Sequence, residues 1–356
     1  MKKLRFGFLS TANIGRKNWL AILNSGNGVV SAVASRDAAR SRQFISECQA
    51  AAPFENVPTA FGSYDELLQS KDVDAVYVPL PTGLRKEFVV RAAEAGKHVL
   101  CEKPCASNLA ELKEMIAGCE KNKVQFMDGV MFMHSRRLGS LRAVLDDKTS
   151  IGPIKRIASQ FTFCGSEEFH TSNIRVDSRL EPLGCLGDLG WYCLRFTLWA
   201  MNWQMPERIE ARMLSRAGKS NVPTEFSAEL FFNGGTSASF YCSFLVSGQQ
   251  WATISGTNGC LYLSDFVLPY DGKQVGFETR DERLVINGCD FRMQPNTKHF
   301  SLAEHANSHS GAQESNMFRA FADHALSGKL NKDWPMWALK TQEVVDACFR
   351  EASKRG

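Results

Sequence analysis

The chain has 356 residues, a formal net charge of +4, 44% apolar residues and 22% charged residues. This length exceeds what one hydrophobic core usually supports, so we expect two domains. The small charge, the scattered lysines and arginines and the lack of a long apolar run argue against nucleic acid or a membrane as the main partner.

The cysteines and the N-terminus predict a reduced, cytoplasmic setting. The eleven cysteines include no C-x-x-C pair, and several lie in apolar segments, where a free thiol packs as a small hydrophobe. Two lysines open the chain, but no apolar stretch typical of a secretory signal follows them. These features favour free thiols over a disulfide framework.

Residues 1–125 alternate between strand-like and helix-like patterns. Strands are expected at 4–9, 28–35, 59–63, 74–81 and 98–104. Helices are expected at 15–25, 37–51, 86–96 and 109–122, with an amphipathic turn at 64–70. This alternation predicts an α/β Rossmann domain with a doubly wound parallel sheet.

The pattern changes after residue 125. Strands are expected at 124–130, 154–164, 207–214, 225–232, 237–244, 251–256, 260–268 and 274–279, with the strand-rich region ending near residue 295. Helical regions are expected near 135–148, at 184–201 and from Gln313 onward. We therefore predict a second, α+β domain over 126–356 with a large, mainly antiparallel sheet, and a C-terminal helix able to pack back on the first domain.

The first strand ends in a turn of small residues, Ser10–Gly15. Ser10, Ala12 and Gly15 occupy the glycine positions of the G-x-G-x-x-G motif, which needs little bulk near the pyrophosphate and free N–H groups at a helix start. Small residues are common in such turns, so this motif alone is weak. The candidate cofactor contacts in the turn are Ser10, Thr11, Ala12, Asn13 and Ile14.

The end of the second strand indicates which dinucleotide this turn would bind. An NAD-preferring site usually has an acidic residue there, on the ribose diol. This chain has Ser35 and Arg36, with Arg40 one helical turn later. A hydroxyl and guanidinium groups suit a 2′-phosphate better than a diol, so we predict NADP.

Two further segments carry groups suited to catalysis. Glu102 and Lys103, followed by a proline, stand at the carboxyl edge of the predicted sheet, where doubly wound folds bind ligands. In the segment 184–195, Asp188 and Tyr192 lie four residues apart, on one face of a helix. The glycines at 184, 187 and 190 would let a ligand approach that face, although an Asp–Tyr pair can also serve only to cap a helix.

Together these segments resemble the glucose–fructose oxidoreductase/inositol dehydrogenase (Gfo/Idh/MocA) family. The resemblance rests on the glycine-poor turn, A-S-R after strand two, V-P-L-P-T at 78–82, E-K-P and G-x-x-D-x-G-x-Y, and it extends to the 254–259 turn and the 339–347 helix. Tyr192, where other members carry histidine, is similar to the branch containing dihydrodiol dehydrogenase, NADP-dependent xylose dehydrogenase and nucleotide-sugar 3-ketoreductases.

The resemblance implies a role for each site residue. Lys103 would contact the nicotinamide ribose and the reacting oxygen, Tyr192 would be the general acid/base, and Asp188 would hold a sugar, polyol or cyclic trans-diol. Further cofactor contacts would come from Pro79, Leu80, Pro81, Thr82, Arg85 and Glu102. Substrate contacts would come from Met131, Phe132, His134 and Arg175. Arg85 takes the place where the family often has histidine, which leaves its cofactor contact open.

The resemblance also implies an active site between the domains and a homodimer formed through the sheet of the second domain. An alternative function is a nucleotide-sugar 3-ketoreductase, which would need a second basic patch, with the arginines at 136, 137, 175 and 179 as candidates. An alternative of another class is a dinucleotide- or sugar-sensing regulator without turnover. His305 and His309 have the spacing of a metal pair on a helix, but Asn, Ser and Gly between and after them argue against helix, and no metal is predicted.

Overall fold

The computed structural model describes residues 2–147, 149–218 and 220–354, which form two compact units. Unit 1 consists of the residues up to Ser135 together with Asp177–Pro182 and Asn307–Glu343. Unit 2 consists of Arg136–Val176, Leu183–Ala306 and the residues from Val344 onward. The division into domains at residues 125 and 126 stays a prediction, because compact packing does not show which segments fold independently.

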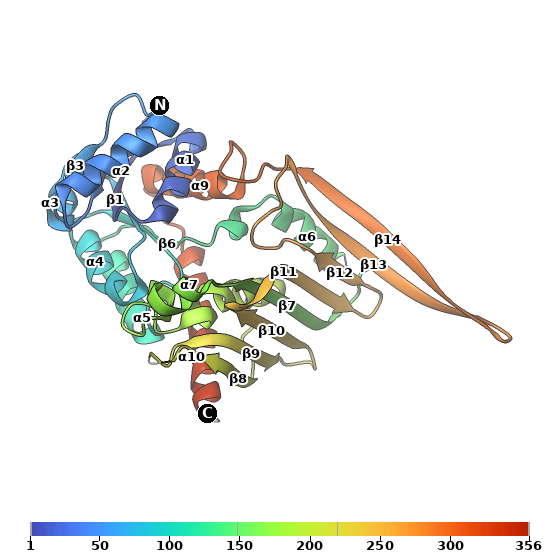
Figure 1. Ribbon diagram of the computed structural model, residues 1–356. Helices are drawn as coiled ribbons and strands as arrows, with labels where there is room; N and C mark the ends of the chain where they lie inside the picture. Colours follow the sequence, from blue (N-terminus) through green and yellow to red (C-terminus); the bar gives the residue numbers. More distant parts are fainter. Residues whose placement is uncertain (1, 148, 219, 355–356) are drawn as a thin grey trace. The chain divides into compact units, whose positions relative to one another are not determined.

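Unit 1 is built on a six-stranded parallel sheet (Figure 1). Its strands are β1 (Leu4–Leu9), β2 (Gly28–Ala34), β3 (Thr59–Phe61), β4 (Ala75–Val78), β5 (His98–Cys101) and β6 (Phe126–Asp128). The order is β3-β2-β1-β4-β5-β6, and every neighbouring pair is parallel. This is the Rossmann order, in which ligands bind outside the carboxyl ends of the strands where the order reverses. The predicted fold of the first half is confirmed.

Helices cover both faces of this sheet because side chains alternate along each strand. The helices are α1 (Asn13–Ser25), α2 (Ala38–Ala51), α3 (Tyr64–Gln69), α4 (Thr82–Glu94) and α5 (Leu109–Lys121). On one face, Phe8 of β1 contacts Trp19 of α1 and Phe44 of α2. On the other, a Cβ on Gly7 would fall against Leu67 of α3. Helix α4 begins four residues before the predicted start at residue 86.

A helix from the far end of the chain completes the first of these faces. In α9 (Gln313–Ser327), Phe318 and Phe321 have ring centroids 5.5 and 5.9 Å from that of Phe6. Phe318 also contacts Tyr77 of β4 at 6.0 Å. The aromatic core of unit 1 therefore joins residues from both ends of the sequence.

Unit 2 is built on an eight-stranded sheet. Its strands are β7 (Ile154–Cys164), β8 (Arg208–Arg216), β9 (Pro223–Phe231), β10 (Ser237–Ser243), β11 (Leu245–Gly256), β12 (Cys260–Leu263), β13 (Gln274–Asn287) and β14 (Asp290–Ala303). The order is β14-β13-β12-β11-β7-β10-β9-β8, and among the described pairs only β7 and β10 run parallel. The predicted, mainly antiparallel sheet is confirmed.

A fully buried helix packs on this sheet. All ten residues of α8 (Trp191–Ala200) are buried, and Phe196 lies 5.3 Å from Phe266 in ring-centroid distance. The remaining helical elements are η1 (Met131–His134), α6 (Arg137–Asp146), α7 (Glu167–Ser172), η2 (Ile174–Val176), η3 (Leu186–Gly190) and α10 (Asp333–Ser353). Within the described residues, no helix is long and apolar enough to cross a membrane.

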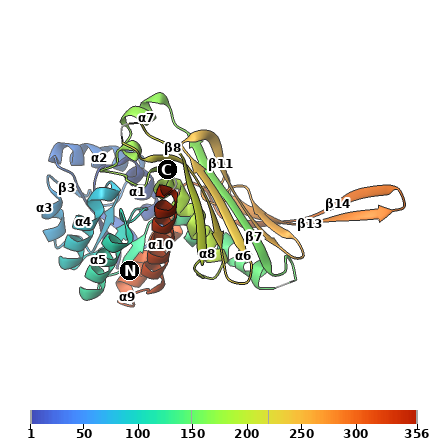
Figure 2. The ribbon, with the colours of Figure 1, turned by 90° about the horizontal axis from the view of Figure 1, so that it is seen from below.

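Strands β13 and β14 form a long hairpin that projects beyond the rest of the sheet (Figures 1 and 2). The expected strand at 274–279 is too short, since β13 continues to Asn287 and pairs along its whole length with β14. The strand expected at 260–268 is longer than the observed strand, because β12 ends at Leu263. Near the tip, four large apolar side chains are more than half exposed: Leu284, Ile286, Phe291 and Met293. The dimer stays a prediction.

Candidate active site

The turn between β1 and α1 combines a glycine-like backbone with an open helix start. Ser10 has a φ of 154°, in the region that favours glycine, and its hydroxyl accepts a hydrogen bond from the Ala12 N–H at 3.1 Å. A Cβ on Gly15 would lie 3.1 Å from Phe44, so helix and strand need glycine there to pack this closely. Within the described chain, no side chain caps α1 and no acidic residue lies in its first turn. This leaves N–H groups for an anion.

The end of β2 carries two exposed guanidinium groups on one side. Arg36 and Arg40 both lower the pKa of the Tyr64 phenol, against a larger upward effect of burial, so both lie near that ring. Asp37 is used elsewhere: its Oδ1 accepts a hydrogen bond from Ala39 N at 2.8 Å and caps α2. In the part of the chain that the structure describes, neither arginine forms an ion pair. Both are therefore available to an anionic group.

Glu102 belongs to a buried hydrogen-bonded chain that the sequence analysis did not identify. The hydroxyl of Tyr77 donates to Glu102 Oε1 at 2.6 Å, and Asn18 Nδ2 donates to the Tyr77 hydroxyl at 2.6 Å. Burial and the neighbouring carboxylate hold the pKa of Tyr77 well above its ordinary value. A Cβ on Gly129 would lie 3.2 Å from the Glu102 carboxyl group. The chain links α1, β4 and the end of β5.

Arg85, predicted as a cofactor contact, is only 5% exposed and faces the protein interior. Its Nε donates to the carbonyl of Leu80 at 2.7 Å. Its Nη1 donates to the carbonyl of Glu102 at 3.0 Å, to the Thr82 hydroxyl at 3.1 Å and to the carbonyl of Pro104. The guanidinium thus joins the loop after β4 to the loop after β5.

A segment distant in sequence caps α4. Glu181 accepts hydrogen bonds from the Thr82 N–H at 3.0 Å and from the Thr82 hydroxyl at 2.5 Å. Leu180 accepts one from the Gly83 N–H at 3.0 Å, and a Cβ on Gly83 would fall against the carbonyl oxygen of Arg179. Thr82 is therefore buried among protein partners rather than open at the sheet edge. No local pattern around Glu181 indicates this contact.

In unit 2, the segment that carries Asp188 is a π-helix, not the regular α-helix that was predicted. Residues Leu186–Gly190 are π-helical, and α8 starts only at Trp191. Because a π turn takes in one residue more than an α turn, Asp188 and Tyr192 are not a regular i,i+4 pair. Single π turns inside helices occur frequently at functional sites.

Two of the predicted substrate residues are in direct contact. Arg175 Nε donates to Asp188 Oδ2 at 2.7 Å, and the side chains are 42% and 15% exposed, respectively. Tyr192 is 6% exposed, and its ring packs edge-on against that of Phe161 at 5.6 Å. The structure therefore brings together an arginine and a carboxylate, with a buried phenol on the adjoining helix.

Two of the glycines near Asp188 serve packing, which corrects the expectation that they open this helix face to a ligand. A Cβ on Gly184 would fall against the carbonyl oxygen of Pro223. A Cβ on Gly190 would lie 3.3 Å from both Cys242 and Phe240 of β10. The small residues are required because the sheet approaches this segment closely.

The remaining predicted residues differ in their surroundings. Phe132 is 1% exposed and Met131 is 8% exposed, so both are buried in η1. His134 contacts Trp334 edge-on at 6.0 Å. Residues 304–312 contain no helix, so His305 and His309 lack the helical geometry of a metal pair. Among the described residues, no group of three or more His, Cys, Asp or Glu could hold a metal ion.

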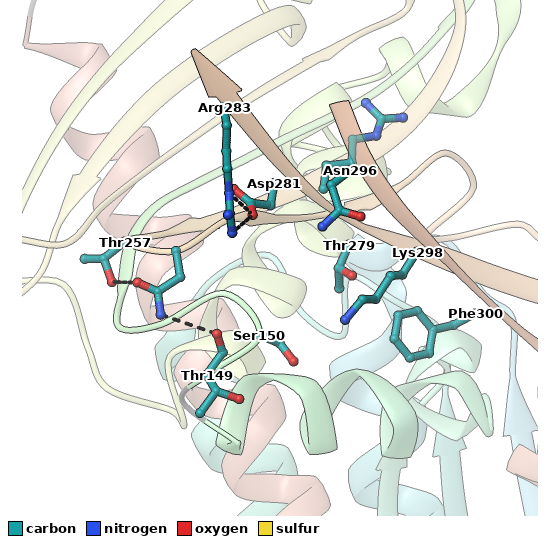
Figure 3. Close-up of a pocket in the computed structure, with 11 residues that line it drawn as sticks. Thr149, Ser150, Thr257, Thr279, Asp281, Arg283, Asn296, Lys298 and Phe300 are labelled. Carbon is teal, nitrogen blue, oxygen red and sulfur yellow. Dashed lines mark hydrogen bonds and ion pairs between the residues drawn. The ribbon is translucent and has the colours of Figure 1, made fainter. Parts of the chain in front are cut away.

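A cavity of about 590 Å³ lies in unit 2, away from all of these residues (Figure 3). It is polar, with the Arg283–Asp281 ion pair and Lys298 on the strands β13 and β14, and with Thr149 and Thr257 on facing turns. None of the predicted site residues lines it. The predicted residues instead fall into two sets, with Lys103 and the dinucleotide turn in unit 1 and with Arg175, Asp188 and Tyr192 in unit 2.

Comparison with known proteins agrees with this division. Residues 4–130 match an oxidoreductase family with an NAD-binding Rossmann fold, and residues 140–262 match the GFO/IDH/MocA C-terminal domain. The chain is 31% identical to trans-1,2-dihydrobenzene-1,2-diol dehydrogenase of Bos taurus, over 74% of each chain. It is also 31% identical to D-xylose 1-dehydrogenase (NADP(+)) 2 of Haloferax volcanii, over 72% of this chain and 75% of that one.

A solved structure extends the similarity over almost the whole chain. A 3-ketoreductase from Actinomadura kijaniata, in complex with NADP and TDP-benzene, superposes with a TM-score of 0.82 at 25% identity and 98% coverage of both chains. The matched regions include the dinucleotide turn, the E-K-P segment and the helix with Asp188 and Tyr192. The chain therefore belongs to the Gfo/Idh/MocA family of oxidoreductases.

Proposed function

We propose that this oxidoreductase uses NADP to oxidise a secondary hydroxyl of a sugar, polyol or cyclic trans-diol, or to reduce the corresponding ketone. The observation that carries the cofactor choice is the pair of exposed guanidinium groups, Arg36 and Arg40, beside Tyr64. Asp37, the nearby acid that could favour a ribose diol, caps α2 instead. Two cations without a competing carboxylate favour a 2′-phosphate.

The residues present fit this cofactor. The open start of α1 suits a pyrophosphate, and Ser10, at the position of the first glycine in the dinucleotide motif, has a positive φ in the region that favours glycine. When bound, NADP supplies the hydride donor or acceptor. Lys103, next to the fixed carboxylate of Glu102, would contact the nicotinamide ribose.

Proton transfer is assigned to Tyr192. A phenol titrates near 10 when unperturbed, and an ammonium close to a phenol favours the phenolate and so activity nearer neutral pH. In oxidation Tyr192 takes the proton of the substrate hydroxyl, and in reduction it returns one to the alkoxide oxygen. Asp188, oriented by Arg175, would accept hydrogen bonds from substrate hydroxyls.

The substrate class is supported by the names of the relatives, a dihydrodiol dehydrogenase and a xylose dehydrogenase. A second candidate, a nucleotide-sugar 3-ketoreductase, is favoured by the solved structure. Its diphosphate would need basic groups, yet three of the four candidate arginines are already in ion pairs, Arg137 with Asp265, Arg175 with Asp188 and Arg179 with Asp177. The fourth candidate, Arg136, is exposed. These pairs favour the smaller, uncharged substrates.

The cellular location and the oligomeric state that we propose are cytoplasmic and homodimeric. All eleven cysteines are free thiols, which supports a reduced, cytoplasmic location. The exposed apolar residues of β13 and β14 support a homodimer through the sheet of unit 2. Light scattering after gel filtration measures the mass of the particle and so its oligomeric state.

The test is a fluorescence titration with NADPH and then NADH, followed by turnover assays on pentoses, polyols and cyclic diols. Arg36→Ala should weaken NADPH binding about tenfold or more and leave NADH binding nearly unchanged, because it removes a charge-assisted contact made only to the 2′-phosphate. Arg42→Ala is the matched control, since Arg42 is an exposed arginine on α2, which begins just after Arg36. Equal binding of both dinucleotides to the unmodified protein would contradict the cofactor assignment. Binding without turnover on any substrate class would favour a sensor.

A further inference from the structure

The residue that remains unexplained by the proposed function is Arg85. A buried guanidinium is costly unless its donors are satisfied. Arg85 is 5% exposed, and its hydrogen-bond partners are three backbone carbonyls and one hydroxyl, all within unit 1. A cofactor phosphate would have to reach a group that is already enclosed and bonded. The position therefore does not suit direct cofactor binding.

The carbonyls that Arg85 holds identify what it does. Two of them belong to Glu102 and Pro104, the residues immediately before and after Lys103. A third belongs to Leu80, in the loop after β4. One rigid, planar group thus ties the backbone on both sides of Lys103 to a neighbouring loop.

Other contacts fix the same region from two sides. Glu102 Oε2 accepts a hydrogen bond from the Lys103 N–H at 3.3 Å, while Oε1 is held by Tyr77. Thr82, which also receives a bond from Arg85, is held by Glu181. The backbone at Lys103 therefore rests on a connected polar network in which Arg85 bonds to both loops, while the Thr82 hydroxyl adds a longer contact of 3.4 Å to the Pro104 carbonyl.

We infer that Arg85 is a positioning residue, which holds the Glu102–Pro104 backbone so that the Lys103 ammonium is presented at a fixed place, and which does not bind the cofactor. The catalytic part of this inference rests on the proposed function, because it takes Lys103 as part of the reaction. The structural part, that Arg85 immobilises this loop, stands without it. Small displacements of catalytic groups cost large factors in rate.

The first experiment measures the loop itself. Amide hydrogen exchange of the peptide containing Glu102–Cys105 should be about tenfold faster in Arg85→Ala than in the unmodified protein. Arg91→Ala is the matched control on the same helix, since its ion pairs with Glu87 and Asp65 are at the surface. It should leave exchange in this peptide unchanged. Unchanged exchange in Arg85→Ala would overturn the inference whether or not the protein is active.

The second experiment is a double-mutant cycle on turnover. Arg85→Ala should lower kcat by about 10- to 100-fold and change the NADPH dissociation constant less than about threefold. In a Lys103→Ala background the same substitution should lower kcat no further, because its effect passes through Lys103. An equally large decrease in kcat in the Lys103→Ala background would overturn the positioning role. A large decrease in NADPH affinity would overturn it as well.

Two further outcomes keep the proposals separable. If Arg85→Ala does not fold, Arg85→Lys replaces it, because an ammonium keeps the charge but not the planar fork that spans both loops. It should show smaller changes of the same kind, and the same two results overturn the inference. If the unmodified protein neither binds NADPH nor turns over, the proposed function fails, and the exchange experiment alone decides whether Arg85 holds the loop.

Discussion

The Nε atom of Arg175 lies 2.7 Å from Oδ2 of Asp188, so the two charges that the sequence suggested for substrate binding are partners in the structure. An ionised carboxylate can accept several hydrogen bonds on its two oxygens, which suits it to donors such as sugar or diol hydroxyls. The arginine fixes the direction in which those acceptors point. The pair is therefore better suited to hydroxyl recognition than to holding a diphosphate.

Arg175→Ala should reduce kcat/KM for the hydroxylated substrate by about tenfold, with little effect on stability. The ion pair is partly exposed, and such pairs contribute about 0–1 kcal/mol to folding. Steady-state kinetics and urea unfolding measure the two effects. Arg179→Ala is the control, because its pair with Asp177 is at the surface. An equal loss of kcat/KM in both variants would remove Arg175 from substrate binding.

Tyr192→Phe should lose most turnover, by about 10²- to 10⁴-fold, while NADPH affinity is retained. The substitution removes only the hydroxyl and keeps the ring contact with Phe161. Single-turnover kinetics and the fluorescence titration measure the two quantities. Tyr270→Phe, at a side chain that is 62% exposed, should leave both unchanged. Turnover near that of the unmodified enzyme would exclude Tyr192 as the proton donor.

Tyr77→Phe should destabilise the protein by about 1–3 kcal/mol, because it removes the buried hydroxyl that accepts from Asn18 and donates to Glu102. Only a longer contact of 3.4 Å between Asn18 Nδ2 and Glu102 Oε1 then joins these two side chains. The free energy of unfolding from urea titration measures this. Tyr241→Phe removes a hydroxyl that donates to Glu225 at a partly exposed position, and it should cost less. Equal decreases in the free energy of unfolding for the two variants would mean that the hydrogen-bonded chain through Tyr77 contributes no more than the partly exposed hydrogen bond of Tyr241.

Stability should fall as the pH is lowered from about 7 through the folded-state pKa of His98. Burial lowers that pKa below its ordinary value of 6.5, and Nδ1 accepts a hydrogen bond from the Gln125 N–H at 2.9 Å. In this window the unfolded chain binds more protons than the folded one, so the free energy of unfolding increases with pH. His98→Asn keeps an acceptor but does not titrate, and it should flatten the profile between about pH 5 and 7. An unchanged slope in this variant would assign the effect to other groups.

Much of unit 1 could be predicted because its strands are buried on both faces and its helices carry apolar stripes. Phe6 and Phe8, for example, mark β1 as a core strand before any contact is known. The hairpin β13–β14 was recognised only at its base, because both of its faces are in solvent toward the tip and burial imposes no alternation there. The period of apolar residues in a sequence reflects burial, so strands that are not buried cannot be predicted from it.

The candidate site residues stand out in the sequence by their type, but the contacts that the structure gives them do not. The E-K-P segment, Arg36 and Tyr192 stand out locally, whereas Glu181 caps a helix that lies far from it in sequence. Arg85 was expected at the cofactor, and the structure shows it enclosed between two loops. Contacts of this kind depend on which surfaces the fold brings together, and no short pattern carries that information.

The packing of α9 on β1 has a consequence for how the chain is made. Phe6 leaves the ribosome long before Phe318 and Phe321, which cover it. At about 5–20 residues per second, the interval is on the order of 15 to 60 s. During this time the nascent sheet has an uncovered aromatic face, which a chaperone can bind. The nucleotide-binding half of this enzyme is therefore complete only after α9 has been synthesised.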